Sequence, residues 1–214
     1  MVSIVAALII IIKCTRKKQT FISLHEYPRV VESLIKNKPV ILQELNNLIK
    51  SEKQWSVWDE KNYSGKKKHF SHSTHDEIIE RLNAKKIKPE TKDNTWTLYG
   101  FILNGKTISE NAKNVPQTLQ IIKSLPGVVN AGFSCLAPNK STGYHKEIDM
   151  GFHRVHLPLI IPKGDCAIKV GSDVRKWIDE DILIFDDRKM HCAWNNTKEY
   201  RYVMVVDVLR PDYV

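Results

Sequence analysis

The feature that most constrains the fold is a series of short apolar, β-branched segments filling the second half of the chain. Turn-forming residues separate these segments, and short strands at such regular spacing are typical of a β-sandwich or jelly roll. Strands are expected at 128–136, 154–161, 166–170, 182–185, 191–194 and 199–209. The spacing therefore predicts that strands form the main scaffold of this half.

The first half of the chain is expected to be mostly helical. Apolar residues recur at helical spacing over 21–50, and Pro39 suits the first turn of a second helix within that range. The 214 residues can enclose one substantial core. Together these patterns predict a single α+β domain over 21–214. The other elements expected are a helix over 76–84, a strand over 95–103 ending in the hairpin turn Asn104-Gly105, and a helix over 116–125.

Residues 1–20 form a distinct N-terminal segment. Val2–Ile12 is apolar apart from one serine, and the basic residues Lys13, Arg16, Lys17 and Lys18 follow it. Eleven helical residues span about 16 Å, against about 30 Å of bilayer hydrocarbon. We expect a short membrane anchor, with the basic cluster keeping the body on the cytoplasmic side. A disordered segment or a buried strand is the alternative.

Charge and cysteine usage exclude several classes of partner. The formal net charge is +9, and setting aside the four basic residues of the N-terminal segment leaves +5 on the body. The basic run Lys66–Lys68 lacks the interleaved aromatic residues of a nucleic-acid surface, so no nucleic-acid partner is expected. The four cysteines show no C-x-x-C spacing, which indicates neither a zinc ribbon nor a disulfide scaffold.

The tripeptide His145-Lys146-Glu147 carries two side chains that can bind a transition metal. On an extended strand, residues two apart face the same way. A third candidate, His191, follows the apolar strand expected at 182–185. Two histidines and a carboxylate describe the iron site of a non-haem Fe(II) oxygenase. Scattered surface histidines are the alternative interpretation of these residues taken alone.

Hairpin geometry predicts that Arg201 lies beside His191. If the turn-forming loop 195–197 centres on Asn196, His191 and Arg201 stand opposite each other with Cβ atoms about 5 Å apart. A guanidinium beside a metal ligand would suit the far carboxylate of a dicarboxylate co-substrate. Pairing of Arg201 with a surface carboxylate, such as that of Glu199, remains open at this point.

Arg154 and His156 share a strand face, and so form a second candidate pair. They can turn toward His145 only if the chain bends between the two segments, and Gly151 is the expected position of the bend. Residues 148–152 are then a loop. His153 falls on the opposite strand face, where a packed or surface histidine is expected.

The motifs that carry these residues closely resemble the aspartyl/asparaginyl β-hydroxylase family. The resemblance runs from about Phe21 to Pro211 and is strongest after Gly127. It rests on Phe133-Ser134, His145, Arg154-Val155-His156-Leu157, Ile160-Ile161-Pro162, Ile182–Asp187, His191, Arg201 and Val206-Asp207-Val208.

The resemblance implies a double-stranded β-helix that uses Fe(II), O₂ and 2-oxoglutarate to hydroxylate an unactivated carbon. His145 and His191 would bind the iron. The remaining matched residues would hold 2-oxoglutarate, with Arg201 and Ser134 at its distal carboxylate and Arg154 and His156 at its metal-chelating end.

Glu147 departs from the pattern of the best-known animal member, which resembles this chain but has glycine there. Other members resemble an H-x-D pattern. We expect Glu147 to be a third iron ligand, and a carboxylate that orients a neighbouring group is the alternative.

The expected substrate is an Asp or Asn side chain in a peptide or protein, attacked at its β-carbon. A lipid acyl chain is the first alternative. A non-catalytic relative that only binds metal or peptide is the rival from another class.

Overall fold

The computed structural model describes residues 20–51, 53–58, 79, 82–83, 85–92, 94–147 and 151–213. The expected membrane anchor in the N-terminal segment and most of the helix expected at 76–84 lie outside these residues. Within the described ranges, no helix is long and apolar enough to cross a membrane.

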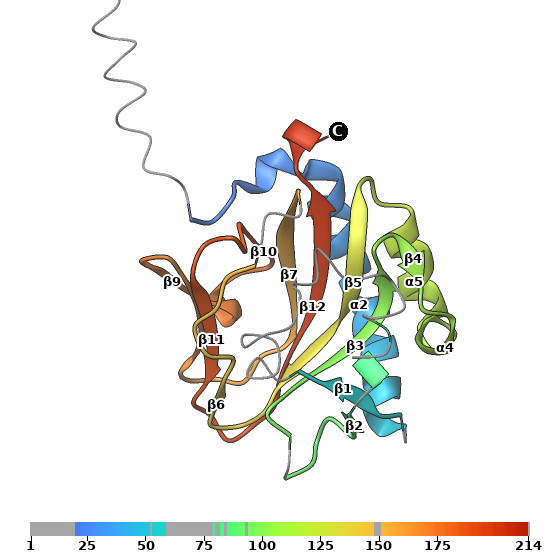
Figure 1. Ribbon diagram of the computed structural model, residues 1–214, viewed down its shortest axis with the longest axis vertical. Coiled ribbons are helices and arrows are strands. Elements are labelled where there is room, and N and C mark those ends of the chain that lie inside the picture. Colours follow the sequence, from blue (N-terminus) through green and yellow to red (C-terminus); the bar gives the residue numbers. More distant parts are fainter. Residues whose placement is uncertain are drawn as a thin grey trace, which may run out of the picture.

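Two antiparallel sheets form the body of the molecule (Figure 1). The larger sheet has the strand order β10-β7-β12-β5-β3-β1-β2, with β4 paired to β3, and the smaller has the order β6-β11-β8-β9. The larger comprises β1 (Trp55–Val57), β2 (Lys86–Ile87), β3 (Trp96–Leu103), β4 (Lys106–Thr107), β5 (Val128–Leu136), β7 (Phe152–Ile160), β10 (Leu183–Phe185) and β12 (Arg201–Leu209). The smaller comprises β6 (Lys140–Ser141), β8 (Cys166–Val170), β9 (Asp173–Lys176) and β11 (His191–Asn195).

These sheets confirm the predicted α+β jelly-roll class. All six strands predicted for the second half are present, with ends shifted by up to two residues. The predicted hairpin is present as well, because β3 and β4 pair on either side of Asn104 and Gly105, which both have positive φ. The short strands β1, β2, β6 and β9 were not predicted, since segments of two to four residues carry too little periodic pattern to recognise.

The region over 21–50 differs from the prediction of two helices. One helix, α2 (Pro28–Lys50), runs through Pro39 without interruption. Its buried residues form one stripe that continues on both sides of the proline, and the packing of this stripe outweighs the one backbone hydrogen bond that proline cannot donate. The stripe consists of Val30, Leu34, Ile41, Leu45 and Leu48.

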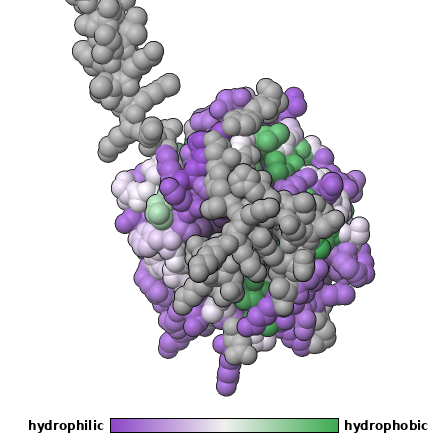
Figure 2. All heavy atoms as spheres, in the orientation of Figure 1, coloured by the Kyte–Doolittle hydropathy of each residue, from purple (hydrophilic) through white to green (hydrophobic). Residues whose placement is uncertain are grey.

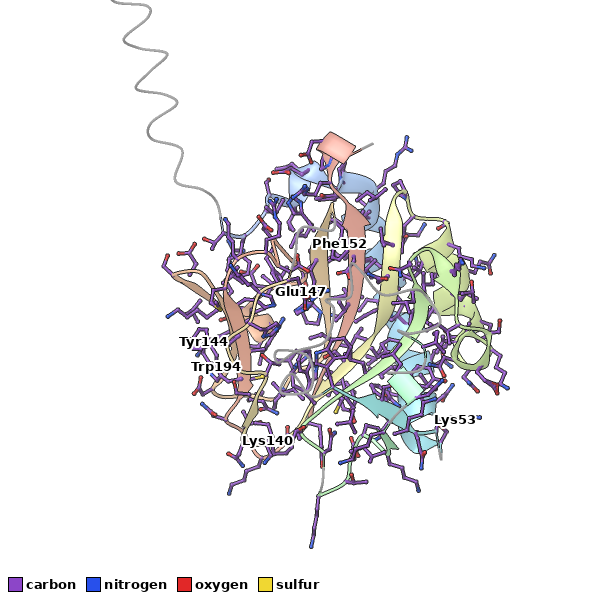
Figure 3. All side chains as sticks on the ribbon, viewed as in Figure 1. Lys53, Lys140, Tyr144, Glu147, Phe152 and Trp194 are labelled. Atoms are coloured by element: carbon purple, nitrogen blue, oxygen red, sulfur yellow. The ribbon has the colours of Figure 1, made fainter. Side chains whose placement is uncertain are left out.

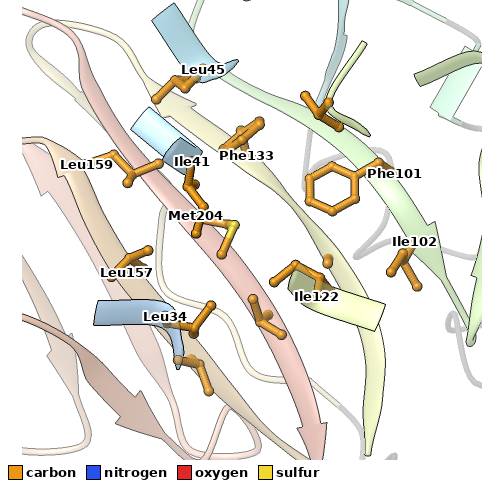
Figure 4. Packing of buried hydrophobic residues seen from close by; sticks show 14 of the residues in the cluster. Leu34, Ile41, Leu45, Phe101, Ile102, Ile122, Phe133, Leu157, Leu159 and Met204 are labelled. Carbon is orange, nitrogen blue, oxygen red and sulfur yellow. The ribbon is translucent and has the colours of Figure 1, made fainter. Parts of the chain in front are cut away.

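Helices α2 and α5 (Pro116–Lys123) cover one face of the larger sheet, and the main core lies between them and the strands (Figure 4). Figure 4 shows Leu34, Ile41 and Leu45 from α2 close to Phe133 on β5 and Met204 on β12. A short helix, α4 (Ser109–Ala112), lies between β4 and α5. The helical layer closes one face of the larger sheet and leaves the other to the smaller sheet.

A second cluster of buried residues lies between the two sheets and includes Phe185 from β10, Ile168 from β8 and Val203 from β12. The expected hairpin between His191 and Arg201 is wrong. β11 pairs with β6 and β8, whereas β12 pairs with β5 and β7 in the other sheet. The chain therefore crosses between sheets after Asn195, whose side-chain amide donates hydrogen bonds to the carbonyl oxygens of Leu136 and Ala137.

Candidate functional site

A cavity between the two sheets brings the sequence-predicted residues together. The smaller sheet and its extension contribute His145 and His191, and the larger sheet contributes residues from β3, β5, β7, β10 and β12. All seven predicted site residues line this cavity: Ser134, His145, Glu147, Arg154, His156, His191 and Arg201.

His145 and His191 form an isolated antiparallel bridge beside the smaller sheet. Their backbones exchange two hydrogen bonds, of 3.0 and 2.8 Å, and their ring centroids are 4.1 Å apart. Nδ1 of His145 lies 3.1 Å from the carbonyl oxygen of Gly143, and Nδ1 of His191 lies 2.8 Å from that of Lys189. A carbonyl oxygen can only accept, so each Nδ1 carries a proton and Nε2 is the atom of each ring that is left to face a ligand.

Burial keeps the His191 ring neutral. Removal from water, with His145 adding to the effect, lowers the pKa of His191 to about 3. A neutral imidazole whose Nδ1–H is bonded to a backbone carbonyl is the form that coordinates transition metals through Nε2. The two rings therefore have the chemistry of a metal-ligand pair.

Glu147 also lines the cavity, and Figure 3 labels it. Its backbone N–H donates to the carbonyl oxygen of Asp187 at 2.9 Å, and its charge helps to raise the pKa of both Asp187 and Arg154. In the part of the chain that the structure describes, no set of three His, Cys, Asp or Glu side chains is arranged to hold a metal ion. The assignment of Glu147 as a third iron ligand stays a prediction.

Arg201 is a buried cation at the end of the cavity on the larger sheet. Only 2 % of the residue is exposed, and its guanidinium lies 4.9 Å from the ring centroid of Trp177. Nη1 donates long hydrogen bonds of 3.4 and 3.5 Å to Oγ and the carbonyl oxygen of Ser134, and the buried Nε has no acceptor. Arg201 forms no ion pair with any other described residue. A buried guanidinium with donors to spare is suited to a carboxylate ligand.

Two tryptophans that sequence reasoning missed position the polar residues around Arg201. Nε1 of Trp96 donates to Oγ of Ser134 at 3.0 Å, and Nε1 of Trp177 donates to Nδ1 of His156 at 3.4 Å. Burial, followed by the charge of Arg201, holds the pKa of His156 well below its usual value. No motif marks these tryptophans, because their partners lie on other strands.

Arg154 occupies the position predicted for it but is already paired. Its Nε lies 2.8 Å from Oδ1 of Asp207, and its Nη2 lies 3.1 Å from Oδ2 of Asp207 and 3.4 Å from Oδ2 of Asp187. Burial opposes the charge, but these carboxylates raise the pKa of Arg154 further. Burial also raises the pKa of Asp187 to about 7, against the opposing effect of Arg154. Asp207, a further residue that sequence reasoning did not assign to the site, therefore fixes the guanidinium.

The predicted bend is confirmed at Gly151, which has φ +76° and precedes the first residue of β7. Strand β7 starts at Phe152, so this residue is strand and not part of a loop, and residues 148–150 of the predicted loop lie outside the described ranges. His153 points away from the cavity, as expected, and is 7 % exposed. Its Nδ1 lies 2.8 Å from the hydroxyl oxygen of Tyr27.

The donor set fits the group of ligands that the resemblance implies. Two imidazoles suit Fe(II), and the unsatisfied, buried Nε of Arg201 suits the carboxylate of 2-oxoglutarate. Both lie in one cavity, so a metal and a dicarboxylate could be held side by side.

Comparisons with known proteins identify the family. Residues 35–211 match the model of the family described as aspartyl/asparaginyl beta-hydroxylase. An ornithine lipid ester-linked acyl 2-hydroxylase of Rhizobium tropici is 36% identical over 131 residues, which cover 60% of this chain and 46% of that protein. The human aspartyl/asparaginyl beta-hydroxylase is 25% identical over 122 residues, or 55% of this chain and 16% of that protein. The chain thus aligns with less than half of either relative.

Solved structures resemble the chain only partly. A 2OG-Fe(II) oxygenase-family oxidoreductase from Burkholderia pseudomallei has a TM-score of 0.42 at 8% identity over 54% of this chain and 66% of that one. The cupin domain of Schizosaccharomyces pombe Cnp3 has a TM-score of 0.36 at 10% identity, with 60% and 76% covered. The family match extends over most of the chain and includes every residue of the site. The chain therefore belongs to the aspartyl/asparaginyl beta-hydroxylase family.

Proposed function

We propose that the protein is an Fe(II)- and 2-oxoglutarate-dependent dioxygenase that hydroxylates an unactivated carbon. The observation that carries the proposal is the buried guanidinium of Arg201 in the same cavity as the paired imidazoles of His145 and His191. Membership of a hydroxylase family supports it.

Each polar residue of the cavity then has a role. His145 and His191 would hold iron through Nε2, with Glu147 as the predicted third ligand. Arg201 would hold the distal carboxylate of 2-oxoglutarate together with Ser134, whose hydroxyl Trp96 already orients. Arg154 and His156 would contact the other end of 2-oxoglutarate, which chelates the metal.

The bound groups would supply the oxidation: one atom of O₂ enters a substrate C–H bond, and the other enters the succinate that forms when 2-oxoglutarate loses CO₂. The protein contributes position and exclusion of water. The ring of Phe185 lies 5.4 Å from that of His191, Ile168 adds an apolar side chain to the cavity lining, and Asp207 holds the guanidinium of Arg154. A dry cavity protects a reactive oxidant from side reactions.

The substrate has two candidates within this chemistry. The human relative is named for hydroxylation of aspartyl and asparaginyl residues, which suggests Asp or Asn side chains in a peptide, and the bacterial relative is named for hydroxylation of an acyl chain. Membrane association through Val2–Ile12 would suit either candidate. A non-catalytic binding protein is the less favoured function, because it has no use for a buried carboxylate site beside the imidazoles.

The test is coupled turnover by the purified chain with Fe(II), O₂ and 2-oxoglutarate. We expect succinate to form in step with a hydroxylated product, and His145→Ala and His191→Ala each to abolish iron binding and turnover. Failure of the intact chain to bind both iron and 2-oxoglutarate would sink the proposal.

Glu147→Ala separates the two roles considered for that carboxylate. If Glu147 is an iron ligand, the variant should lose iron affinity by about tenfold or more. Iron affinity is measured by competition with a chromogenic chelator, and Glu180→Ala, which removes a carboxylate that does not line the cavity, serves as the control. Unchanged affinity and turnover would remove Glu147 from the ligand set.

A further inference from the structure

A row of four side chains crosses the larger sheet on the face that lines the cavity. Asn130 on β5 stands opposite Asp207 on β12, which in turn stands opposite Arg154 on β7. Arg154 stands opposite Phe185 on β10, and all four residues line the cavity. Directly opposite residues share a face of a sheet, so each side chain can contact the next. The ring of Phe185 lies 5.4 Å from that of His191, so the row ends beside the imidazole pair.

Asp207 holds the guanidinium of Arg154 in one orientation. Its two carboxylate oxygens accept hydrogen bonds from Nε and Nη2 of Arg154, at 2.8 and 3.1 Å. Such a two-point contact fixes the plane of the guanidinium as well as its position. Nη2 also lies 3.4 Å from Oδ2 of Asp187, whereas Nη1 has no acceptor among the residues that the structure describes. Nη1 is therefore the nitrogen left to face a ligand in the cavity.

This ion pair is sheltered from water. The described surface seen in Figure 2 is largely hydrophilic, and charges at such a surface are screened by solvent and salt. By contrast, only 20 % of the Arg154 side chain and 3 % of the Asp207 side chain are exposed. A buried pair is screened much less, so whatever orients the carboxylate of Asp207 also orients Arg154.

Asn130 fixes the carboxylate of Asp207 from the other side of the row. Nδ2 of Asn130 donates to Oδ2 of Asp207 at 2.9 Å, and Oδ1 of Asn130 accepts from the backbone N–H of Asn104, also at 2.9 Å. A backbone N–H can only donate, so this second bond fixes which end of the amide faces Asp207. The amide therefore presents a donor, and not an oxygen, to the carboxylate.

A hairpin turn and a β-bulge hold Asn130 in place. The register of β5 against β12 shifts next to Asp207, and the extra residue on β5 is Val129. Its carbonyl oxygen accepts from the backbone N–H of Gly105 at 2.8 Å, beside the bond from Asn104 to Asn130. Both turn residues have positive φ, the conformation that Asn and Gly adopt most readily. The turn that joins β3 to β4 is thus attached to β5 at two adjacent residues.

We infer that Asn130 and Asp207 are positioning residues for Arg154, and that the hairpin turn supports them. The turn orients the amide of Asn130, the amide orients the carboxylate of Asp207, and the carboxylate directs Nη1 of Arg154 into the cavity. This inference rests on the proposed function, in which Arg154 contacts the metal-chelating end of 2-oxoglutarate. Asn130 acts on co-substrate affinity only through Arg154.

The test is a double-mutant cycle on 2-oxoglutarate affinity, measured by calorimetric titration of the Fe(II)-loaded chain without oxygen. Asn130→Leu keeps a similar size but has no hydrogen-bonding group, and it should weaken 2-oxoglutarate binding about tenfold, as loss of an outer contact to a ligand-binding group does. Arg154→Met should weaken binding at least as much. Adding Asn130→Leu to Arg154→Met should change the affinity by less than about twofold, because no guanidinium remains to be positioned. Two effects that multiply in the double variant would overturn the inference.

Two controls separate positioning from general damage. Asn114→Leu removes an asparagine amide that also donates to a side-chain oxygen, the hydroxyl of Tyr99, but lies outside the cavity lining, so 2-oxoglutarate affinity should be unchanged. Iron affinity, measured by competition with a chelator, should be unchanged in Asn130→Leu, because each imidazole is oriented by its own backbone carbonyl contact. An equal loss of iron and 2-oxoglutarate affinity would overturn the inference, since it would indicate distortion of the whole site.

A measurement on the metal-free chain does not depend on the co-substrate. The Nε–H proton of Arg154, assigned by its loss from the NMR spectrum of Arg154→Met, should exchange with water at least about threefold faster in Asn130→Leu than in the intact chain. Equal exchange rates would overturn the inference and leave the proposed function intact. Absence of 2-oxoglutarate binding by the intact chain would instead contradict the proposed function, and this inference with it.

Discussion

Arg201 holds a positive charge inside the protein without a carboxylate beside it among the described residues. Burial lowers the pKa of Arg201 to about 10, which leaves the side chain protonated at neutral pH. An uncompensated buried ion costs several kcal/mol. That cost is offset when an anion binds, so the residue favours the complex over the free protein.

Arg201→Met should weaken 2-oxoglutarate binding roughly 10- to 100-fold, because hydrogen bonds to a charged group contribute about 1.5–3 kcal/mol. The free protein should be as stable as before or more so, since an apolar side chain of similar length replaces an uncompensated ion. Calorimetric titration measures the first effect and urea unfolding the second. Arg175→Met, which removes an exposed arginine paired with Glu180, is the control. Equal 2-oxoglutarate affinity in Arg201→Met and the intact chain would exclude this carboxylate site.

At the scale of elements, Glu44 joins the two helices that cover the larger sheet. Its buried carboxylate on α2 accepts hydrogen bonds from the backbone N–H groups of Gln117 and Thr118, at 3.0 and 2.8 Å. These are N–H groups in the first turn of α5, which have no partner within their own helix. A side chain 73 residues away thus does the work of a helix cap.

Glu44→Ala should lower the free energy of unfolding by about 1.5–3 kcal/mol, since two buried N–H groups lose a charged acceptor. Glu32→Ala, an exposed position on the same helix, controls for the change in helix propensity and charge. Urea denaturation followed by circular dichroism gives both values. Equal stability of the two variants would show that water replaces Glu44 at the helix end.

Local pattern predicted most of the elements and the residues of the site. Strands β5, β7 and β12 were recognisable as runs of apolar, β-branched residues, most of which are buried, and α5 was recognisable because proline and helical spacing coincide. The wrong expectations concern long-range packing. Whether a helix is interrupted at Pro39 depends on what the helix packs against. Whether the chain forms a hairpin after Asn195 depends on pairing with strands of the other sheet, which are distant in the sequence.

At the scale of the whole molecule, the two sheets divide the site between them. The imidazoles of His145 and His191 belong to the smaller sheet and its extension, whereas Ser134, Arg201 and His156 belong to the larger one. The larger sheet is backed by the main core under α2 and α5. In the smaller sheet, β6 and β9 are exposed along their whole length.

Thiol labelling should show that the larger sheet, which is backed by the main core, opens less readily than the smaller sheet. Burial raises the pKa of Cys135 on β5 and of Cys166 on β8 to about 11, so neither thiol should react with iodoacetamide at pH 8, and reactivity should rise only as pH approaches 11. Under mild urea, Cys166 should be labelled before Cys135, because its sheet has less backing. Mass spectrometry of peptides after timed labelling gives the order, and simultaneous labelling would mean that the sheets unfold together.

The bridge between His145 and His191 affects the thermal stability of this sheet edge and the rate at which it opens. It joins residues far apart in the chain through two backbone hydrogen bonds. Local opening of that edge would separate the imidazoles while the rest of the protein stays folded. A metal held by both rings would then act as a staple, raising the temperature at which the edge opens and slowing hydrogen exchange at those two amides.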